Sequence, residues 1–407
     1  MHEATRTFCC RAGFVLGCLL PTLLITGWIV VRRSPVYAQA QQTQWQAQLA
    51  QTLGLSAQVE RIEEPRPGRY VLHGVTLLDP DAPKHSLPLA KAKRLELGRG
   101  ASGLVIVASE GEIASEHLPR LWAILHERLV RGPEVARTPV HLSLSSLTLS
   151  APADRADQSL KLSDLRGQLL STASAAKAIV EFRPAGEFGE PARLSVERDR
   201  TKHPVATKWS LSTGATPLPC SALAPCIPSL SNLGPDCTFH GYVVMEVRDH
   251  QWHAATGGTF ANLDLTTLVS QRLGHSLSGT ANVAINQAIW RDGKLATASG
   301  QLRASQGVIS RRLWEDAAKE LSLQITEPLA RFTDAQVRYH ELAVGFELKE
   351  RVLRLAGQCA NQPQDTILAD EYGPLVMGSS ARPIEPIALV RALVPASDGS
   401  VPAVQEA

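Results

Sequence analysis

Three groups of residues have types and spacings that could carry chemistry, and the first is a glycine-rich run. Gly98 to Gly103 match the G-x-G-x-x-G pattern of dinucleotide-binding loops. That pattern binds pyrophosphate only where a helix opens at the glycines. Here the apolar run Leu104 to Val107 follows, which is typical of a strand. We therefore interpret the glycines as a turn between two strands.

The second group is a pair of histidines, His250 and His253, in an H-x-x-H arrangement. Zinc sites need three or four protein ligands. On a strand, residues three apart face opposite sides of the sheet, so this pair would not chelate one ion. We therefore predict no metal site, and no motif in the chain predicts a cofactor.

The third group is made of cysteines. Cys220, Cys226 and Cys237 lie in or at the end of a stretch rich in Pro, Ser and Cys, 216–237, which predicts a long loop. No C-x-x-C pair is present, which disfavours a zinc knuckle. We favour a disulfide, with Cys220–Cys226 as the first choice. Together with Cys359, four cysteines allow three connectivities, and free buried thiols are the alternative.

The chain contains no G-x-S-x-G, H-E-x-x-H or P-loop motif. We therefore predict that it is not an enzyme. Lys and Arg number 41 against 39 Asp and Glu, which gives a formal net charge of +2. Such a chain lacks the electrostatic footprint of a nucleic-acid-binding protein. With aromatic residues at only 5%, a base-stacking surface is also disfavoured.

The elements that would position any site begin with a membrane segment. Ala12 to Val31 are 20 residues without a charge. As a helix they would span roughly 30 Å, the thickness of a bilayer's hydrocarbon core. We predict one transmembrane helix, with residues 1–11 as a cytoplasmic tail and the rest of the chain exported. The residues predicted to anchor it at the membrane surfaces are Arg11, Trp28, Arg32 and Arg33.

Cleavage of this segment is the alternative to a retained anchor. Val36-Tyr37-Ala38 would suit a signal peptidase. The apolar run is longer than a usual signal core, however, and two arginines separate it from that site. We favour the retained anchor. The exported part holds four cysteines, an even number that fits an oxidising compartment.

Beyond the membrane segment the apolar pattern changes from helical to extended. Residues 41–54 predict an amphipathic juxtamembrane helix, with Trp45, Leu49 and Leu53 on one face. Short strands with frequent turns then fill two β-rich regions, 55–215 and 238–360, on either side of the loop 216–237. A Pro-rich tail, 361–407, ends the chain.

One strand shows its pattern clearly. From Val140 to Ser150 apolar and polar residues alternate as far as Leu144, and the alternation resumes with Leu147 and Leu149. A strand of period 2 with serine outward has one buried face. Helical stripes interrupt the strands at 115–131, at 264–273, after Ser310 and at 387–393. We predict a mainly β (α+β) fold: a transmembrane helix, then an extended or curved antiparallel β-sheet body with a few interposed short helices.

The order of these pieces resembles the N-terminal part of the AsmA-like family of membrane-anchored bacterial envelope proteins. Four stretches carry the resemblance over about half of the chain, and the membrane helix is the first. The second is the helix WQAQLAQTLGL, the third is the hinge Gly74 to Pro80 with the run Leu89 to Leu97, and the last is the glycine-started strands Leu277 to Val283 and Ser299 to Ser310.

The resemblance implies a single-pass protein of the bacterial inner membrane with its C-terminal part in the periplasm. It implies a curved sheet with an apolar concave face that works in lipid transport or outer-membrane assembly. Membrane lipid would then hold the anchoring helix and also supply the acyl-chain ligand. An envelope protein would be a second partner. This chain is short for a protein that bridges two membranes.

Two other functions stay open. One is an envelope scaffold for a partner protein, without a lipid groove, and the other is an envelope hydrolase of unrecognised class. Alternating aliphatic residues describe an open groove and a closed sandwich equally well, so the sequence does not distinguish them.

Overall fold

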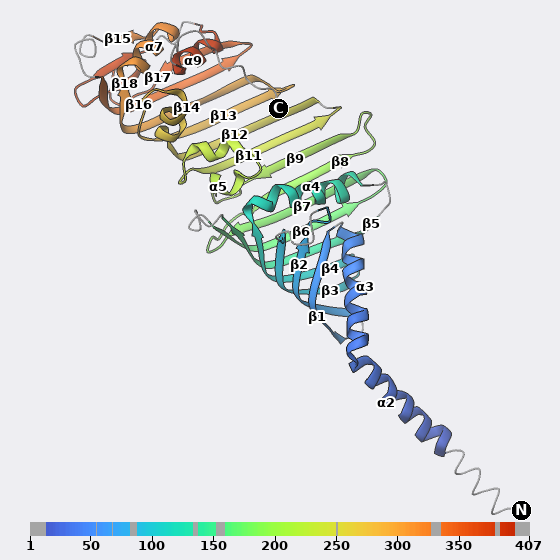
Figure 1. The fold of residues 1–407 in the computed structure, drawn as a ribbon. Helices are drawn as coiled ribbons and strands as arrows, with labels where there is room; N and C mark the ends of the chain where they lie inside the picture. The colour runs from blue at the N-terminus through green and yellow to red at the C-terminus, as the bar shows by residue number, and fades with distance from the viewer. Residues whose placement is uncertain are drawn as a thin grey trace, which may run out of the picture.

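The computed structural model describes residues 14–53, 55–66, 68–81, 88–132, 137–151, 159–249, 251–326, 335–378 and 383–394. These residues form one continuous sheet of 19 strands with few helices. Figure 1 shows the strands side by side in a long row that begins at the N-terminal helices, drawn in blue. The predicted fold class, mainly β with a large antiparallel sheet and few helices, is confirmed at this level.

The strands follow chain order along the sheet. β9 pairs with β11 and β14 with β16, so that the two-residue strands β10 and β15 stand beside the main row. The bounds are β1 (Ser56–Arg66), β2 (Arg69–Leu78), β3 (Ala90–Gly100), β4 (Gly103–Ala114), β5 (Arg137–Ser150), β6 (Leu160–Ser171), β7 (Ala175–Pro184), β8 (Ala192–Asp199), β9 (Ala206–Ser212), β10 (Leu218–Pro219), β11 (Thr238–Arg248), β12 (Gln251–Asp264), β13 (Thr280–Arg291), β14 (Lys294–Ser310), β15 (Gln324–Ile325), β16 (Gln336–Lys349), β17 (Val352–Gly357), β18 (Thr366–Ala369) and β19 (Pro374–Met377).

β4 and β5 form a parallel pair, in contrast to their antiparallel neighbours. Parallel neighbours cannot be joined by a tight turn and need a crossover of a dozen or more residues. The crossover is helical and consists of η2 (Ser115–His117), α4 (Leu118–Leu125) and η3 (His126–Arg131), where the sequence predicts a helix. Its residues Leu121 and Ile124 are buried. The apolar stripe therefore docks the crossover onto the sheet.

The N-terminal helices are η1 (Val15–Leu19), α2 (Leu20–Arg33) and α3 (Pro35–Leu53). α3 begins before the expected residue 41 because Ser34 acts as its N-cap: the Ser34 hydroxyl accepts a hydrogen bond from the Tyr37 N–H at 3.3 Å, and Pro35 suits the first helical position. α3 lies along β1 and β2, where the rings of Trp45 and Tyr70 are 4.6 Å apart.

Within the described ranges, none of the helices is both long and apolar enough to cross a membrane.

The remaining helices are short. The stretch 216–237, expected to be a loop, contains the strand β10 and two short helices, α5 and η5. The Pro-rich tail contributes two buried strands, β18 and β19, in which Leu368 and Leu375 are at most 2% exposed. The bounds of the remaining short helices are α5 (Cys220–Leu223), η5 (Pro228–Leu233), η6 (Thr266–Ser270), α6 (Gln271–Leu273), α7 (Arg311–Leu321) and α9 (Pro386–Leu393).

The two faces of the sheet differ in chemistry. Residues directly opposite in neighbouring strands share a face. One line across β5 to β9 contains Leu142, Gly167, Val180, Leu194 and Leu211. A line on the other face contains Ser143, Arg166, Glu181, Arg193 and Ser212. We call these the apolar face and the polar face. This division is the one that strands with a single covered side require.

Each of the first six strands contains one extra residue, and these residues lie side by side across the sheet. The extra residue in β5 explains its interrupted alternation. There the apolar side chains pass from Leu144 to Leu147. At the same level, β2, β4 and β6 carry residues with positive φ, at Gly74 (59°), Glu110 (49°) and Asp164 (50°). Because each of these strands has the extra residue, the pairing at this level stays in register, and it shifts only at β7. The apolar residues of both strand halves therefore stay on the apolar face.

Candidate functional site

The apolar face continues beyond the crossover as a row of side chains across β9 to β13. Trp209 lies opposite Met245, and Met245 lies opposite Ala254. Ala254 in turn lies opposite Trp290. All four residues are half-buried. The row is therefore apolar, contiguous and partly open to solvent, which makes it the main candidate for binding an apolar ligand.

The crossover covers the N-terminal end of this row. The rings of Trp122 in α4 and Trp209 in β9 meet edge to face, with centroids 4.9 Å apart, and His126 lies at the same distance from Trp209. At the end of the crossover, Arg200 donates a hydrogen bond to the carbonyl oxygen of Gly132 at 3.1 Å. The aromatic contact and the arginine together fix the crossover over β7 to β9.

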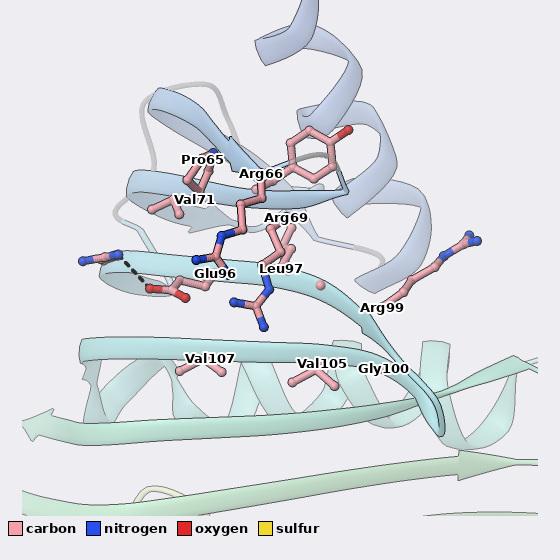
Figure 2. Close-up of a pocket in the computed structure, with 13 residues that line it drawn as sticks. Pro65, Arg66, Arg69, Val71, Glu96, Leu97, Arg99, Gly100, Val105 and Val107 are labelled. Carbon is pink, nitrogen blue, oxygen red and sulfur yellow. Dashed lines mark ion pairs between the residues drawn. The ribbon is translucent and has the colours of Figure 1, made fainter.

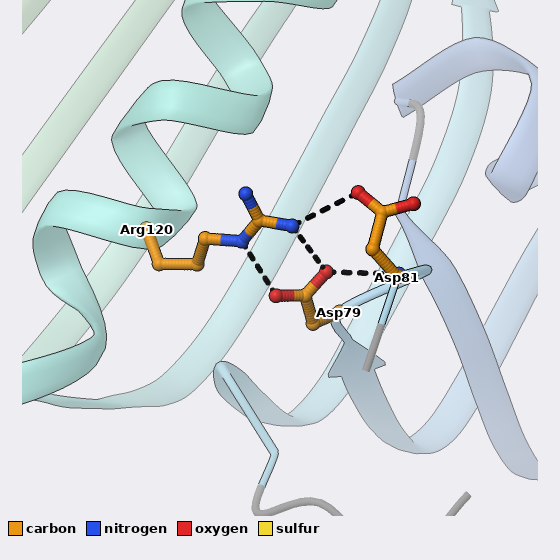
Figure 3. A network of polar contacts seen from close by, with 3 residues as sticks. All are labelled: Asp79, Asp81 and Arg120. Atoms are coloured by element: carbon orange, nitrogen blue, oxygen red, sulfur yellow. Dashed lines mark hydrogen bonds and ion pairs between the residues drawn. The ribbon is translucent and has the colours of Figure 1, made fainter. Parts of the chain in front are cut away.

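An ion-pair network fixes the start of the crossover (Figure 3). Arg120 in α4 donates to both carboxylate oxygens of Asp79, at 2.5 and 2.9 Å, and to Asp81 at 2.9 Å. The hydrogen bond from Arg120 is the main reason that the pKa of Asp79 lies below its usual range. Asp79 follows β2 in the stretch Gly74 to Pro80, so this contact ties the end of the β2 strand to the crossover.

Two helices cover the C-terminal part of the apolar face. Leu321 at the end of α7 and Ala392 in α9 pack over Ala298 and Leu348 of the sheet. Figure 1 shows α7 and α9 at the end of the row of strands opposite to the N-terminal helices. The half-buried row around Met245 lies between these helices and the crossover.

A cavity of about 610 Å³ opens at the edge of the apolar face. It lies between the start of the crossover, the ends of β5 and β6, and the α5–η5 segment. Its volume falls in the range of pockets for small organic ligands. Glu116 and several hydroxyl groups supply its polar part, and its apolar lining consists of Pro119, Leu149, Leu160, Ala224, Leu230 and Pro235.

The shifted pKa values of several titratable groups have structural causes, either hydrogen bonds or burial. Hydrogen bonds from Thr201 lower the pKa of Asp199. Burial raises the pKa of Asp264, but hydrogen bonds led by that from Thr267 outweigh it, so its pKa is lowered. Burial lowers the pKa of His126. In the ranges that the structure describes, no group of three or more His, Cys, Asp or Glu residues could hold a metal ion.

The motifs that could carry chemistry lie apart from the apolar face. Gly100 and Gly103 pair across the β3–β4 turn, as predicted for the glycine-rich run. His253 is exposed on β12, and His250 lies outside the described residues. Ser174 and Lys177 have the S-x-x-K spacing of a nucleophile and its base. The Lys177 ammonium, however, pairs with Glu197 at 3.6 Å on the polar face, so its charge is already engaged.

The cysteines are arranged differently from the expected pairing. The structure brings Cys220 together with Cys237 instead of Cys226: the two sulfur atoms are 2.8 Å apart, and both residues are fully buried. The cause is the pairing of β10 with β11, which the spacing of the cysteines does not reveal. Cys226 is exposed, and Cys359 is buried separately. All four cysteines are unbonded in this structure.

The predicted anchor residues lie at the N-terminal end. Arg11 is outside the described residues, as are the side chains of Trp28, Arg32 and Arg33 in α2. Several apolar side chains of α2 are exposed, with Leu23 and Val30 each 63% exposed.

Comparison with known proteins gave no match to a family model, a curated protein or a solved structure. The resemblance to the AsmA-like family therefore rests on the sequence patterns.

Proposed function

We propose that this protein handles lipids of the bacterial cell envelope, by holding acyl chains along the apolar face and without catalysing a reaction. It is anchored in the inner membrane by the segment Ala12 to Val31, and its β-sheet body lies in the periplasm. The observation that carries the proposal is the half-buried row from Trp209 to Trp290, which lies between two helical covers.

The chemistry of the row suits an aliphatic chain. Its side chains carry no charge and present carbon and sulfur surfaces apart from two indole N–H groups, and the strands behind it are paired with one another. Moving one CH₂ group out of water contributes about 0.8 kcal/mol. A row that covers ten methylenes would therefore contribute on the order of 8 kcal/mol before the entropy of ordering the chain is subtracted.

The exposure of α2 supports the anchor. Apolar side chains that are more than half exposed, such as Leu23, Ile25 and Val30, are costly in water and favourable in a bilayer. The 20 uncharged residues and the arginines at both ends support the same placement.

The test is to extract the full-length protein from membranes in a mild detergent and to identify bound lipid by native mass spectrometry. Met245 and Val244 are neighbours in β11 that face opposite sides of the sheet. We expect Met245→Glu to lower the lipid-bound fraction several-fold, because it places a charge in the apolar row. Val244→Glu, on the polar face, is the matched control and should keep the lipid.

Lipid that co-purifies with the wild type and with Val244→Glu, but not with Met245→Glu, supports the proposal. A wild-type protein without lipid contradicts it. A stoichiometric protein partner in place of lipid would point to the scaffold alternative.

A further inference from the structure

A second pocket lies on the polar face, near the N-terminal helices. It has a volume of about 400 Å³ and is formed by the first four strands around the turn between β1 and β2. Figure 2 shows that Arg66 and Arg69 extend in the same direction from this turn, across the strand that carries Glu96 and Leu97. We call this the arginine pocket. It is separate from the row around Met245, which lies on the apolar face of β9 to β13.

The lining of the arginine pocket has an excess of positive charge. Four arginines, Arg66, Arg69, Arg94 and Arg99, and one carboxylate, that of Glu96, line the pocket. Arg99 extends away from the other three (Figure 2). Glu96 is engaged by Arg94 at 2.7 Å. Within the described part of the chain, the other three arginines form no ion pair. Their guanidinium groups are therefore available to a ligand.

The turn itself places two like charges against each other. Arg66 and Arg69 are direct partners in the β1–β2 pairing, on either side of the turn. Like charges directly opposite on neighbouring strands destabilise a sheet. An anion between the two guanidinium groups would convert this repulsion into two charge-assisted contacts. Guanidinium groups match phosphate oxygens in a two-pronged geometry, which favours phosphate among anions.

Two valines, on either side of Glu96, give the floor of the pocket its apolar surface. Val71 is 5% exposed beneath the arginines, whereas Val107 on β4 is 44% exposed, an unusual value for a valine in the middle of a sheet. Val71 lies opposite Glu96, and Glu96 lies opposite Val107, so the three form one line across the pocket. The pocket thus combines a cationic rim with a small apolar surface.

We propose that the arginine pocket binds a phosphate-bearing anion, with the phosphate held by Arg66 and Arg69 and an attached carbon group resting on Val107. A phospholipid headgroup and a free phosphate share this chemistry, and the two are separated by the choice of probe. The site is independent of acyl-chain binding on the apolar face.

The test uses the full-length protein in a neutral detergent at constant ionic strength. Inorganic phosphate, dihexanoyl phosphatidylglycerol and the zwitterionic dihexanoyl phosphatidylcholine are titrated separately, and binding is followed by calorimetry and by the rise in melting temperature. Removing one charge-assisted hydrogen bond costs about a factor of ten or more in affinity. We expect that loss for Arg66→Gln and for Arg69→Gln. Arg193→Gln, on the polar face of β8, is the control and should bind as the wild type does.

A charge reversal separates binding from folding. Arg66→Glu creates an opposite-charge pair with Arg69, so the protein should melt at the same or a higher temperature while losing the phosphate response. Binding of inorganic phosphate or of phosphatidylglycerol supports the proposal, and the one that binds identifies the source of the phosphate. The proposal is overturned if neither binds the wild type, or if all the arginine variants bind with unchanged affinity.

Discussion

Replacing Cys220 by alanine should destabilise the β-sheet body far more than replacing Cys226. Cys220 and Cys237 are neighbours where β10 meets β11, and the backbone N–H of Cys220 donates to the carbonyl oxygen of Cys237 at 2.8 Å. Their sulfur atoms already lie 2.8 Å apart, so only a small movement separates them from the bonding distance of a disulfide. In an oxidising periplasm we therefore expect a Cys220–Cys237 disulfide.

The expected loss of stability follows from the length of the loop that this disulfide closes. The two cysteines are 17 positions apart. Closing a loop of that length removes enough entropy from the unfolded chain to stabilise the fold by about 3 kcal/mol. The loss of a buried sulfur atom in Cys220→Ala adds to that cost. The exposed Cys226 makes no such contact, and its replacement should change the stability by about 0.5 kcal/mol or less.

The assay is urea unfolding of the full-length protein in detergent, with and without dithiothreitol, alongside peptide mapping under non-reducing conditions. The reductant should remove most of the difference between the wild type and Cys220→Ala. Two results would refute the reasoning. One is a peptide map that links Cys220 to Cys226, and the other is an equal loss of stability in the Cys220 and Cys226 variants.

Three further predictions concern the fold. Burial lowers the pKa of His126 in the folded protein, so below about pH 6.5 the unfolded chain binds more protons than the folded one. The melting temperature should therefore fall as the pH drops through that value, and His126→Gln should reduce this fall. Arg120→Gln should let the pKa of Asp79 rise toward its usual value, measured by NMR titration, and a pKa that stays low would refute the role of Arg120. A Cβ atom at Gly307 would overlap the carbonyl oxygen of Ser278, so Gly307→Ala should cost about 1–3 kcal/mol in urea unfolding. An unchanged midpoint would show that the strand can shift to make room.

Local patterns allowed much of the fold to be predicted. The alternation in Val140 to Ser150 identified β5 and its apolar face, and the stripe at 115–131 identified the crossover helix. The same stripe did not reveal that β4 and β5 are parallel, because a helix between two strands fits either orientation until the strands are paired. The break after Leu144 was visible in the sequence. Its cause was not, since it depends on matching residues such as Glu110 in the neighbouring strand.

The sites depended on contacts between residues far apart in the chain. Arg66 and Arg94 line one pocket only because β1, β2 and β3 pair in a particular register. The contact of Cys220 with Cys237 likewise follows from strand pairing, and the spacing of the cysteines favoured a different partner. The sequence predicted an apolar sheet face but not the row around Met245, since it does not show where helices leave that face uncovered.

The measurement that tests lipid binding most directly compares two alanines that are neighbours in β12. Ala254 lies on the apolar face opposite Met245, whereas Ala255 lies on the polar face opposite Val244, and both are half-buried. A photo-cross-linking amino acid is placed at each position in the full-length protein in cells, and the purified products are examined by mass spectrometry for lipid adducts. Lipid binding on the apolar face predicts adducts at position 254 and several-fold fewer at 255. Equal labelling at both positions, or no lipid adduct at 254, would contradict it.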